Sequence, residues 1–392
     1  MVDRIRMGFV IPGDGNWSGG INYLRTVLAT IRAELSGQIT ARLFISPDQR
    51  TLAEATFAPL LEVPVILDDR VAGAGSGTRA LAAILTGRDR GMADLALAHG
   101  IDLMFESARF YGNRFPVPVL SWIPDFQHKY LPNLFGRVAW WKRELGFRAQ
   151  CAGGREILLS SQAAQADCEQ FYPAARGRTH VARFATSVPL AEVVARMHTV
   201  RADHDLPERF FFLPNQFWEH KNHRIVVAAL RLIAEQGRLA DTPPVILSGA
   251  TADPRNPQLF ATVMRQVNAA GLAEKFRHLG HIPYLDVLAL NMTALAVVNP
   301  SRFEGWASSV EEAKAMGSPM ILSDIPVHHE QAPSARFFGP DDASSLVAVL
   351  QEAARLPGRP PLDPSFAAET LHRKAFAVAL RSAVAATGVQ VP

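Results

Sequence analysis

The chain has 392 residues, which predicts two domains at the usual size of roughly 100–200 residues each. Its 40 Lys and Arg residues nearly balance its 37 Asp and Glu residues, and a formal net charge of +3 is too small for an electrostatic nucleic-acid binder. Hydrophobic residues at 48% and charged residues at 20% exclude a disordered chain, and two cysteines cannot form a disulfide framework.

The N-terminal residues and the distribution of apolar residues bear on localisation. Residues 1–6 lead directly into a strand pattern, without the basic, apolar and small-residue segments of a signal peptide. No apolar run approaches the roughly 18–20 residues that cross a bilayer. We therefore expect a cytoplasmic protein, and leave open a peripheral contact with the inner face of the membrane.

Short apolar segments alternate with longer amphipathic ones along the chain. In the first half, the expected strands are Ile5–Ile11, Ala41–Ser46, Val63–Leu67, Val117–Trp122, Glu156–Ser160 and His180–Phe184. In the second half, they are Phe210–Leu213, Val245–Ser248, Phe276–Leu279, Leu295–Asn299, Met320–Ser323 and Arg336–Phe338. Several are continuous apolar runs, which are typical of strands buried on both faces of a parallel sheet.

Helical spacing of apolar residues is clearest in Gly20–Leu35 and His223–Glu235. The alternation of strands and helices predicts a doubly wound α/β fold with a break near 188–208. We expect an N-terminal Rossmann-like acceptor domain over 1–190 and a C-terminal Rossmann-like donor domain over 205–365. The segment 366–392 is expected to form a helix that packs back toward the N-terminal domain. Ligands of such sheets bind at the carboxyl ends of the strands.

Residues 300–319 have the pattern of a strand end, a loop, a helix and a stop. Glu304 lies in the loop, Glu312 lies one turn into the helix, and Gly317 ends the helix. The N–H groups at such a helix start form an anion site suited to a diphosphate, and the carboxylate of Glu312 could accept hydrogen bonds from sugar hydroxyls.

A structural alternative exists for the same residues. Ser309 with Glu312, and Ser308 with Glu311, each have the spacing of a capping box. The two serines would then serve only to cap the helix, and neither glutamate would need a ligand.

The spacing of Glu304 and Glu312, with Phe-Glu-Gly before and a Gly-x-Pro turn after, resembles the E-x7-E signature of glycosyltransferase family 4. These group 1 glycosyltransferases of bacterial polysaccharide synthesis are retaining enzymes that use nucleotide-diphosphate sugars. The resemblance implies a GT-B fold, in which two Rossmann-like doubly wound parallel-sheet domains face a central cleft. It also implies that Glu312 binds the nucleotide ribose and that Glu304 stabilises developing positive charge. The donor would further contact Gly305, Trp306, Ala307 and Ser308.

The segment Phe210–His223 runs from a strand through a loop to a helix start, and it contains Lys221. An isolated loop lysine is most often only solvated, but a lysine at a helix start can neutralise a leaving diphosphate. The segment resembles the stretch in which family 4 enzymes grip the diphosphate with an Arg and a Lys. Here Gln216 stands where the family has Arg, and Asn215 where it has Gly.

Glutamine can hydrogen-bond a phosphate but carries no charge, so the grip on the diphosphate departs from the family pattern. Either Lys221 acts with another cation, or the donor is held differently. Arg302 and Arg255 are the candidate substitutes.

Two loops of the first half complete the candidate site. Glycines follow the first strand at Gly13-Asp14-Gly15 and again at Gly19 and Gly20, which match the glycine pair that lines the cleft in the family. A plain turn is the structural alternative. Asp125 and His128 follow a central strand, where family 4 enzymes often carry His-Asp near the reacting centre. They could contact hydroxyls or shuttle a proton, although a loop histidine is more often a structural hydrogen-bonding group.

Further loops resemble those that hold the nucleotide base through backbone groups, at Gly249 and at His281 and Ile282. The pair His328-His329 does not have metal-ligand spacing, and the sequence has neither an HExxH nor a convincing Asp-x-Asp motif. We therefore expect no cofactor and no metal, with the nucleotide sugar as donor substrate.

A basic and aromatic stretch extends through 135–148 and contains Trp140, Trp141, Lys142 and Arg148. It is either an interfacial patch that touches lipid headgroups or a partly buried helix with a solvated face.

These observations favour a retaining glycosyltransferase that moves a hexose, mannose-like or other, from a GDP- or UDP-sugar to a saccharide or lipid-linked acceptor. Two alternatives are a nucleotide-sugar epimerase of GT-B fold and a GT-B pseudoenzyme that acts as a scaffold. An NAD oxidoreductase is disfavoured because the glycine-rich loop lacks the dinucleotide fingerprint.

Overall fold

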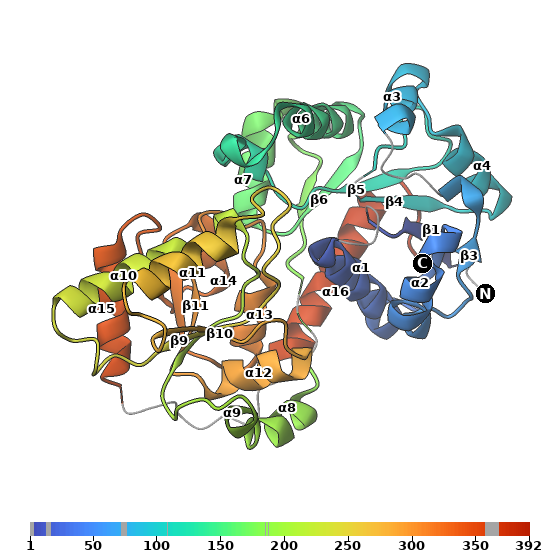
Figure 1. Cartoon of the computed structure of the whole chain (residues 1–392). Helices are drawn as coiled ribbons and strands as arrows, with labels where there is room; N and C mark the ends of the chain where they lie inside the picture. Colours follow the sequence, from blue (N-terminus) through green and yellow to red (C-terminus); the bar gives the residue numbers. More distant parts are fainter. Residues whose placement is uncertain are drawn as a thin grey trace. The chain divides into compact units, whose positions relative to one another are not determined.

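The computed structural model of the chain describes residues 4–12, 17–71, 77–107, 109–184, 186, 188–356 and 368–392 (Figure 1). The chain divides into two compact units, of which unit 1 comprises Met1–Ala185 with Thr370–Pro392 and unit 2 comprises Thr186–Glu369. Each unit has a parallel sheet and its own helices, which confirms the predicted α/β class.

Unit 1 is built on a seven-stranded sheet with the strand order β3-β2-β1-β4-β5-β6-β7. Every strand pair is parallel. The strands are β1 (Ile5–Val10), β2 (Ile39–Ile45), β3 (Ile66–Leu67), β4 (Leu103–Ser107), β5 (Val119–Trp122), β6 (Glu156–Leu159) and β7 (Thr179–Val181). The order reverses direction between β1 and β4, which is the arrangement of a Rossmann-type sheet.

The main core of unit 1 packs helices α1 and α16 against one face of this sheet. Leu24, Val27, Leu28 and Ile31 of α1 are buried, as their helical spacing predicts, and α16 adds Leu380 to the same cluster. Figure 1 shows the red C-terminal helix α16 beside the blue α1. The helices are α1 (Ser18–Glu34), α2 (Arg50–Thr56), α3 (Gly77–Thr86), α4 (Arg90–Ala98), α5 (Gln127–Tyr130), α6 (Arg137–Ala152), α7 (Gln162–Phe171) and α16 (Ala368–Ala386).

Unit 2 contains a six-stranded sheet with the order β10-β9-β8-β11-β12-β13, and its strand pairs are also parallel. The strands are β8 (Phe211–Leu213), β9 (Val245–Leu247), β10 (Phe276–His278), β11 (Ala296–Asn299), β12 (Met320–Ser323) and β13 (Arg336–Phe338). Each agrees with its expected strand to within one residue at either end. The order reverses between β8 and β11, so the carboxyl ends of these two strands mark the switch point where ligands bind in such sheets.

Helices cover the sheet of unit 2, and α10 carries the four apolar side chains expected to face the core. Val226, Val227, Leu230 and Ile233 are all buried. The helices are α8 (Leu190–Met197), α9 (Val200–Asp203), α10 (His223–Glu235), α11 (Leu259–Ala269), α12 (Tyr284–Thr293), α13 (Ser308–Ala315), α14 (Pro326–Gln331) and α15 (Ala343–Ala354).

One strand of unit 1, β4, is not among the strands predicted from the sequence. β4 is buried along its whole length although it ends in Glu106 and Ser107. The Glu106 carboxylate accepts hydrogen bonds from the Tyr111 N–H (2.7 Å) and the Ser121 hydroxyl (2.5 Å), so partners outside the strand compensate its burial. A polar strand end of this kind has no apolar signature.

Within the described ranges, no helix combines the length and the apolar character needed to cross a membrane.

Candidate active site

The candidate residues of unit 2 gather at the carboxyl edge of its sheet, in loops that follow β8, β9, β10 and β11. Lys221 belongs to a short 3-10 helix, Glu219–Lys221, between β8 and α10. Glu304 lies in the loop between β11 and α13. β8 and β11 are neighbours at the switch point, so the two loops meet there.

Lys221 and Glu304 form an ion pair at this point, with 2.5 Å between Nζ and Oε1. Burial of Glu304 favours a raised pKa. The charges of Lys221 and His220, with the hydrogen bonds from Lys221 and Ser301, outweigh that effect and lower the pKa to about 2. The carboxylate therefore stays ionised at neutral pH, and the pair has no net charge.

A buried polar network holds Glu304 in place, and two of its members, Asn299 and Ser301, were not among the site residues predicted from the sequence. The Ser301 hydroxyl lies 2.6 Å from Glu304 Oε1 and 2.7 Å from Asn299 Oδ1, and can donate to one of them at a time. Asn299 Oδ1 also accepts from Asn215 Nδ2 (3.1 Å). Ser309 closes the ring, since its hydroxyl accepts from Asn299 (3.3 Å) and donates to Asn215 Oδ1 (3.2 Å). The detectable signal was a polar residue at the end of a buried strand and a second one two positions later.

The serine caps that were the structural alternative at α13 are not formed. The N-cap is Ala307, and no side chain caps the helix from that position, because the helix begins one residue earlier than a serine cap requires. Gln331 fastens the helix start instead: its Oε1 accepts from the Ala307 N–H (3.0 Å) and its Nε2 donates to Ala307 O (3.1 Å). Ser308 is exposed at the first helical position, while Ser309 belongs to the network around Asn215.

The predicted end of α13 is confirmed. Gly317 has a φ of +60°, its N–H donates to Lys314 O (3.0 Å), and the Ser318 N–H donates to Ala313 O (2.8 Å). This is a Schellman turn, which favours glycine at the left-handed position.

Glu312 has a different environment from Glu304. It is 9% exposed and sits among buried residues of α13, and the hydroxyl of Tyr284 donates to its Oε1 (3.2 Å). Burial raises its pKa to about 7, and the single hydrogen bond from Tyr284 offsets this only in part. Two carboxyls of one short segment thus have pKa values on opposite sides of the ordinary value, which is a pattern of functional sites.

The loops after β9 and β10 are fastened to each other. The Gly249 N–H donates to Gly280 O (2.9 Å), and Gly249 O lies 3.1 Å from His278 Nε2. Gly249 has a φ of +131°, and a Cβ there would lie 3.0 Å from the backbone of Asn215, so only glycine fits. The backbone of Gly249 therefore lies close to the backbone of Asn215 at this edge of the sheet. Of the other candidates here, His281 is exposed, whereas the Ile282 side chain is buried in the core and presents only its backbone to the edge.

The cations near Lys221 differ in how they are held. Gln216, at the position expected for Arg, is half-buried. Arg302 forms an ion pair with Asp341 (2.8 Å) on the surface of unit 2. Arg255, in the loop after β9, lies against His220 and Trp218.

The candidates Gly19, Gly20, Asp125 and His128 belong to unit 1. The segment Gly13-Asp14-Gly15 lies outside the described residues. Gly19 and Gly20 form the first turn of α1, and a Cβ on Gly20 would come within 2.3 Å of the Trp17 ring. The glycine thus makes room for an aromatic side chain that stacks on Trp122.

Asp125 lies two residues before α5, and its Oδ1 accepts from the Gln127 N–H (2.9 Å) and from Arg143 (2.7 Å). His128 is fully buried. Its Nε2 lies 3.1 Å from the Glu144 carboxylate, which also binds Lys129 (2.7 Å). Burial lowers the pKa of His128 more than Glu144 raises it. This geometry favours a structural role for the imidazole, the alternative stated above.

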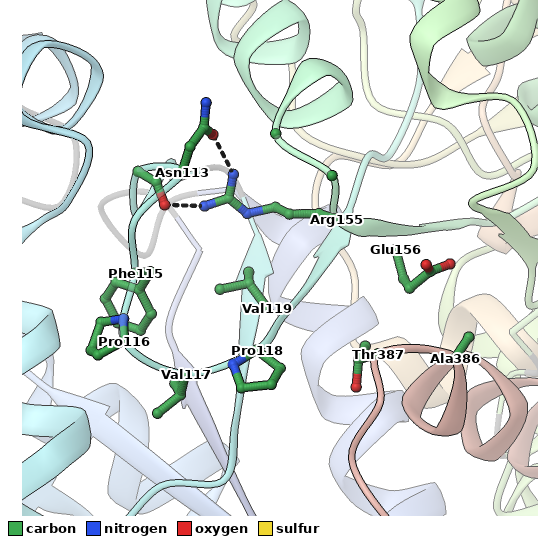
Figure 2. Close-up of a pocket in the computed structure, with 13 residues that line it drawn as sticks. Asn113, Phe115, Pro116, Val117, Pro118, Val119, Arg155, Glu156, Ala386 and Thr387 are labelled. Carbon is green, nitrogen blue, oxygen red and sulfur yellow. Dashed lines mark hydrogen bonds between the residues drawn. The ribbon is translucent and has the colours of Figure 1, made fainter.

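A pocket of unit 1 lies elsewhere. It has a volume of about 420 Å³ and is lined by residues just before β5 and β6, together with Ala386 and Thr387. These residues stand at the amino edge of the sheet, opposite the carboxyl ends where ligands of such sheets bind. Figure 2 shows Arg155 turned to Asn113 Oδ1 (3.1 Å) and Gly112 O (2.6 Å). No predicted site residue lines this pocket.

Comparison with known proteins places unit 2 in a family. Residues 199–359 match the family model of glycosyl transferases group 1. Unit 2 is a group 1 glycosyltransferase domain. The family predicted from the spacing of Glu304 and Glu312 is therefore confirmed. The O-antigen chain mannosyltransferase RfbU of Salmonella typhimurium is 27% identical over 151 residues, which span 38% of this chain and 40% of that relative's length.

Solved structures show the fold of the whole chain. A glycosyltransferase from Rickettsia africae aligns with a TM-score of 0.67 at 12% identity and covers 98% of each chain. Anabaena HepE, solved in complex with UDP and glucose, aligns with a TM-score of 0.62 at 16% identity, again over 98% of each chain. The fold is that of the GT-B glycosyltransferases, with two Rossmann-like domains, as predicted.

Proposed function

We propose that this protein is a retaining glycosyltransferase that moves a hexose from a GDP- or UDP-sugar to a saccharide or lipid-linked acceptor in bacterial cell-surface polysaccharide synthesis. The observation that carries the proposal is the Lys221–Glu304 pair beside Glu312 at the carboxyl edge of a group 1 glycosyltransferase domain. The names of RfbU, an O-antigen chain mannosyltransferase, and of HepE with UDP and glucose support the polysaccharide context and the type of donor.

In this proposal the donor lies along the carboxyl edge of unit 2. Glu312 accepts hydrogen bonds from the ribose hydroxyls. Lys221 and the N–H groups of Gly305, Trp306 and Ser308 stabilise the diphosphate as it leaves, while the Ala307 N–H stays bonded to Gln331. Glu304, held ionised by Lys221, faces the sugar and stabilises positive charge that develops at the anomeric carbon.

The remaining donor contacts are assigned to the loops. We propose that the backbone at Gly249, His281 and Ile282 holds the base, and that Asn215 and Gln216 line the phosphate side. In unit 1, Gly19, Gly20 and Asp125 are proposed as contacts for substrate. His128 is retained as a candidate proton carrier, although its burial requires a local movement before any substrate reaches it.

We further propose that transfer needs no metal or other cofactor. The negative charge of the leaving diphosphate would be met by side-chain cations and by the dipole of α13, which act where the charge develops.

A panel of ligands tests donor binding. Thermal unfolding of the whole protein is measured with UDP, GDP and NAD, since a ligand that binds only the folded state raises the melting temperature. We expect a rise with UDP or GDP and none with NAD. A rise with NAD alone would contradict the proposal. Donor conversion without any acceptor, giving an epimerised nucleotide sugar, would favour the epimerase.

We also propose that unit 1 contacts an anionic membrane surface through α6. Val138, Trp141 and Leu145 stand at helical spacing and are 84%, 54% and 52% exposed. Around the helix they form one stripe, with Arg137 and Arg148 on one side and Lys142 on the other. The only acidic residue of α6, Glu144, is buried. An exposed apolar stripe between cations fits a bilayer with anionic headgroups.

Vesicle sedimentation tests the membrane contact. We expect the protein to bind vesicles of phosphatidylcholine with phosphatidylglycerol and to bind pure phosphatidylcholine more weakly. Replacing both Trp141→Ser and Leu145→Ser should reduce binding at least about tenfold. The control is Val378→Ser, which removes an exposed apolar side chain (69%) of α16. Equal binding by the double variant and the control would contradict this contact.

A further inference from the structure

The candidate donor site has fewer positive charges than the diphosphate of a donor would need. A nucleotide-diphosphate sugar carries a negative charge on each of its two phosphates. Lys221 supplies one positive charge, but its Nζ is already 2.5 Å from Glu304 Oε1. Gln216, in the same loop, is neutral. The Lys221–Glu304 pair alone therefore offers the diphosphate no net positive charge.

Two neighbouring arginines, Arg302 and Arg224, form ion pairs with other carboxylates. Arg302 directs both Nε and its terminal nitrogen to Asp341 Oδ1, at 2.9 and 2.8 Å, and this pair is exposed on the surface. Arg224, on α10, lies 3.5 Å from the carboxylate of Glu219. Each of these two guanidinium groups is paired with a carboxylate that is at least partly exposed, whereas Asp253, the carboxylate paired with Arg255, is buried and also accepts from the Glu219 N–H.

Arg255 is held by other contacts, close to the loop that carries Lys221. It follows β9, the strand next to β8, so its loop stands beside the one that contains Lys221. Its guanidinium lies 5.2 Å from the centre of the Trp218 ring and 3.4 Å from His220 Nδ1. His220 directly precedes Lys221, and its charge already influences the pKa of Glu304. Arg255 is thus within one residue of the Lys221–Glu304 pair.

A buried carboxylate fixes this position. Asp253 Oδ1 accepts from the Arg255 N–H (2.9 Å) and from Arg255 Nε (3.2 Å), while Oδ2 accepts from the Glu219 N–H (3.1 Å). The Asp253 side chain is fully buried, and that of Arg255 is 27% exposed. The carboxylate therefore ties the β9 loop to the start of the Lys221 helix, and its arginine reaches the surface beside them. Holding a guanidinium in place reduces the entropy that a phosphate contact would cost.

We propose that Arg255 is the second phosphate-binding cation of this site and that it takes the place of the charge missing at Gln216. The inference rests on the proposed function, since it assumes a nucleoside diphosphate donor. Asp253 and Trp218 act as positioning residues: the carboxylate orients the guanidinium, and the indole ring supports its face. A planar guanidinium supported in this way can bind two phosphate oxygens at once, which a lysine ammonium cannot do in the same geometry.

The test compares diphosphate and nucleoside affinities in matched variants. Binding of UDP, GDP, uridine and guanosine is measured by calorimetry for the wild type, Arg255→Gln, Arg255→Lys and the control Arg302→Gln. A lost hydrogen bond to a charged group, about 1.5–3 kcal/mol, corresponds to a loss of about 10- to 150-fold in affinity. We expect Arg255→Gln to lose that factor for the nucleoside diphosphate while nucleoside affinity stays within about twofold. Arg255→Lys should recover part of the loss, and Arg302→Gln should bind like the wild type.

The outcomes separate the two proposals. If the wild type binds neither UDP nor GDP, the proposed function fails, and this inference falls with it. If the wild type binds a diphosphate and Arg255→Gln binds it equally well, only the inference is overturned. It is also overturned if Arg255→Gln loses nucleoside and diphosphate affinity alike, since that pattern indicates a distorted loop. Thermal unfolding of each variant identifies a folding defect, and Arg255→Lys then carries the comparison.

Discussion

Glu312 gives the sharpest prediction about stability, because its pKa rises on folding from the ordinary 4.5 to about 7. Between these two values the folded state binds more protons at Glu312 than the unfolded state does. The free energy of unfolding therefore falls as the pH rises through this window, and the full cost is present above about pH 7. The shift of about 2.5 pKa units, at about 1.4 kcal/mol each, corresponds to a cost of about 3 kcal/mol.

Glu312→Gln removes that cost, because the amide has nearly the same shape and no charge. Tyr284 can donate to the amide oxygen as it does to the carboxyl. We expect the variant to be more stable than the wild type by about 3 kcal/mol at pH 8, and equally stable near pH 4.5. The measurement is urea unfolding of both proteins at the two pH values.

Glu311→Gln is the matched control on the same helix. Glu311 is also buried, but it pairs with Lys314 at 3.0 Å, so its replacement should not stabilise the protein at pH 8. Glu312→Gln should at the same time bind UDP or GDP more weakly, since the ribose hydroxyls lose a charged acceptor. Greater stability with weaker binding is characteristic of a residue kept for function. A Glu312→Gln variant no more stable than the wild type at pH 8 would refute this reasoning.

Three further predictions concern the same edge of unit 2. Gly249→Ala should destabilise the protein by about 1–3 kcal/mol, because its φ of +131° and the 3.0 Å approach to Asn215 exclude a Cβ; an unchanged melting temperature would contradict this. Lys221→Ala should raise the pKa of the buried Glu304 and reduce transfer by about 100-fold or more, measured as release of nucleotide, whereas turnover at the wild-type rate would remove Lys221 from the site. Transfer should be unchanged in EDTA, and a loss of activity restored by added Mg²⁺ would show that the mechanism uses a metal.

The sequence was sufficient for most of the fold because its strands are simple. Most strands of unit 2 are short apolar runs between polar or turn-forming segments, so the pattern alone locates them. β4 was not predicted because it ends in the polar residues Glu106 and Ser107. The partners that make Glu106 tolerable, Tyr111 and Ser121, are adjacent to it only in the folded chain. No local pattern reveals such compensation.

The residues of the candidate site also differ in whether the sequence could predict them. A fixed spacing and a resemblance were enough to single out Lys221, Glu304 and Glu312. Asn299 and Ser301 were missed, because the hydrogen bonds that link Asn299 to Asn215 and Ser309 join separate segments that only the sheet brings together. The capping boxes indicated by the sequence are not formed, for a related reason. Ser308 and Ser309 have the correct spacing, but Gln331 from α14 holds the helix start one residue earlier.

The central claim is that this chain transfers a sugar from a nucleotide diphosphate. Its most direct test is a panel of UDP- and GDP-sugars in which release of UDP or GDP is followed for the wild type and for Glu312→Ala. We expect the wild type to release nucleotide from at least one donor, and Glu312→Ala to release it far more slowly. If the wild type binds a nucleotide diphosphate but turns over no donor, with or without saccharide acceptors, the account is contradicted and the chain is a GT-B scaffold.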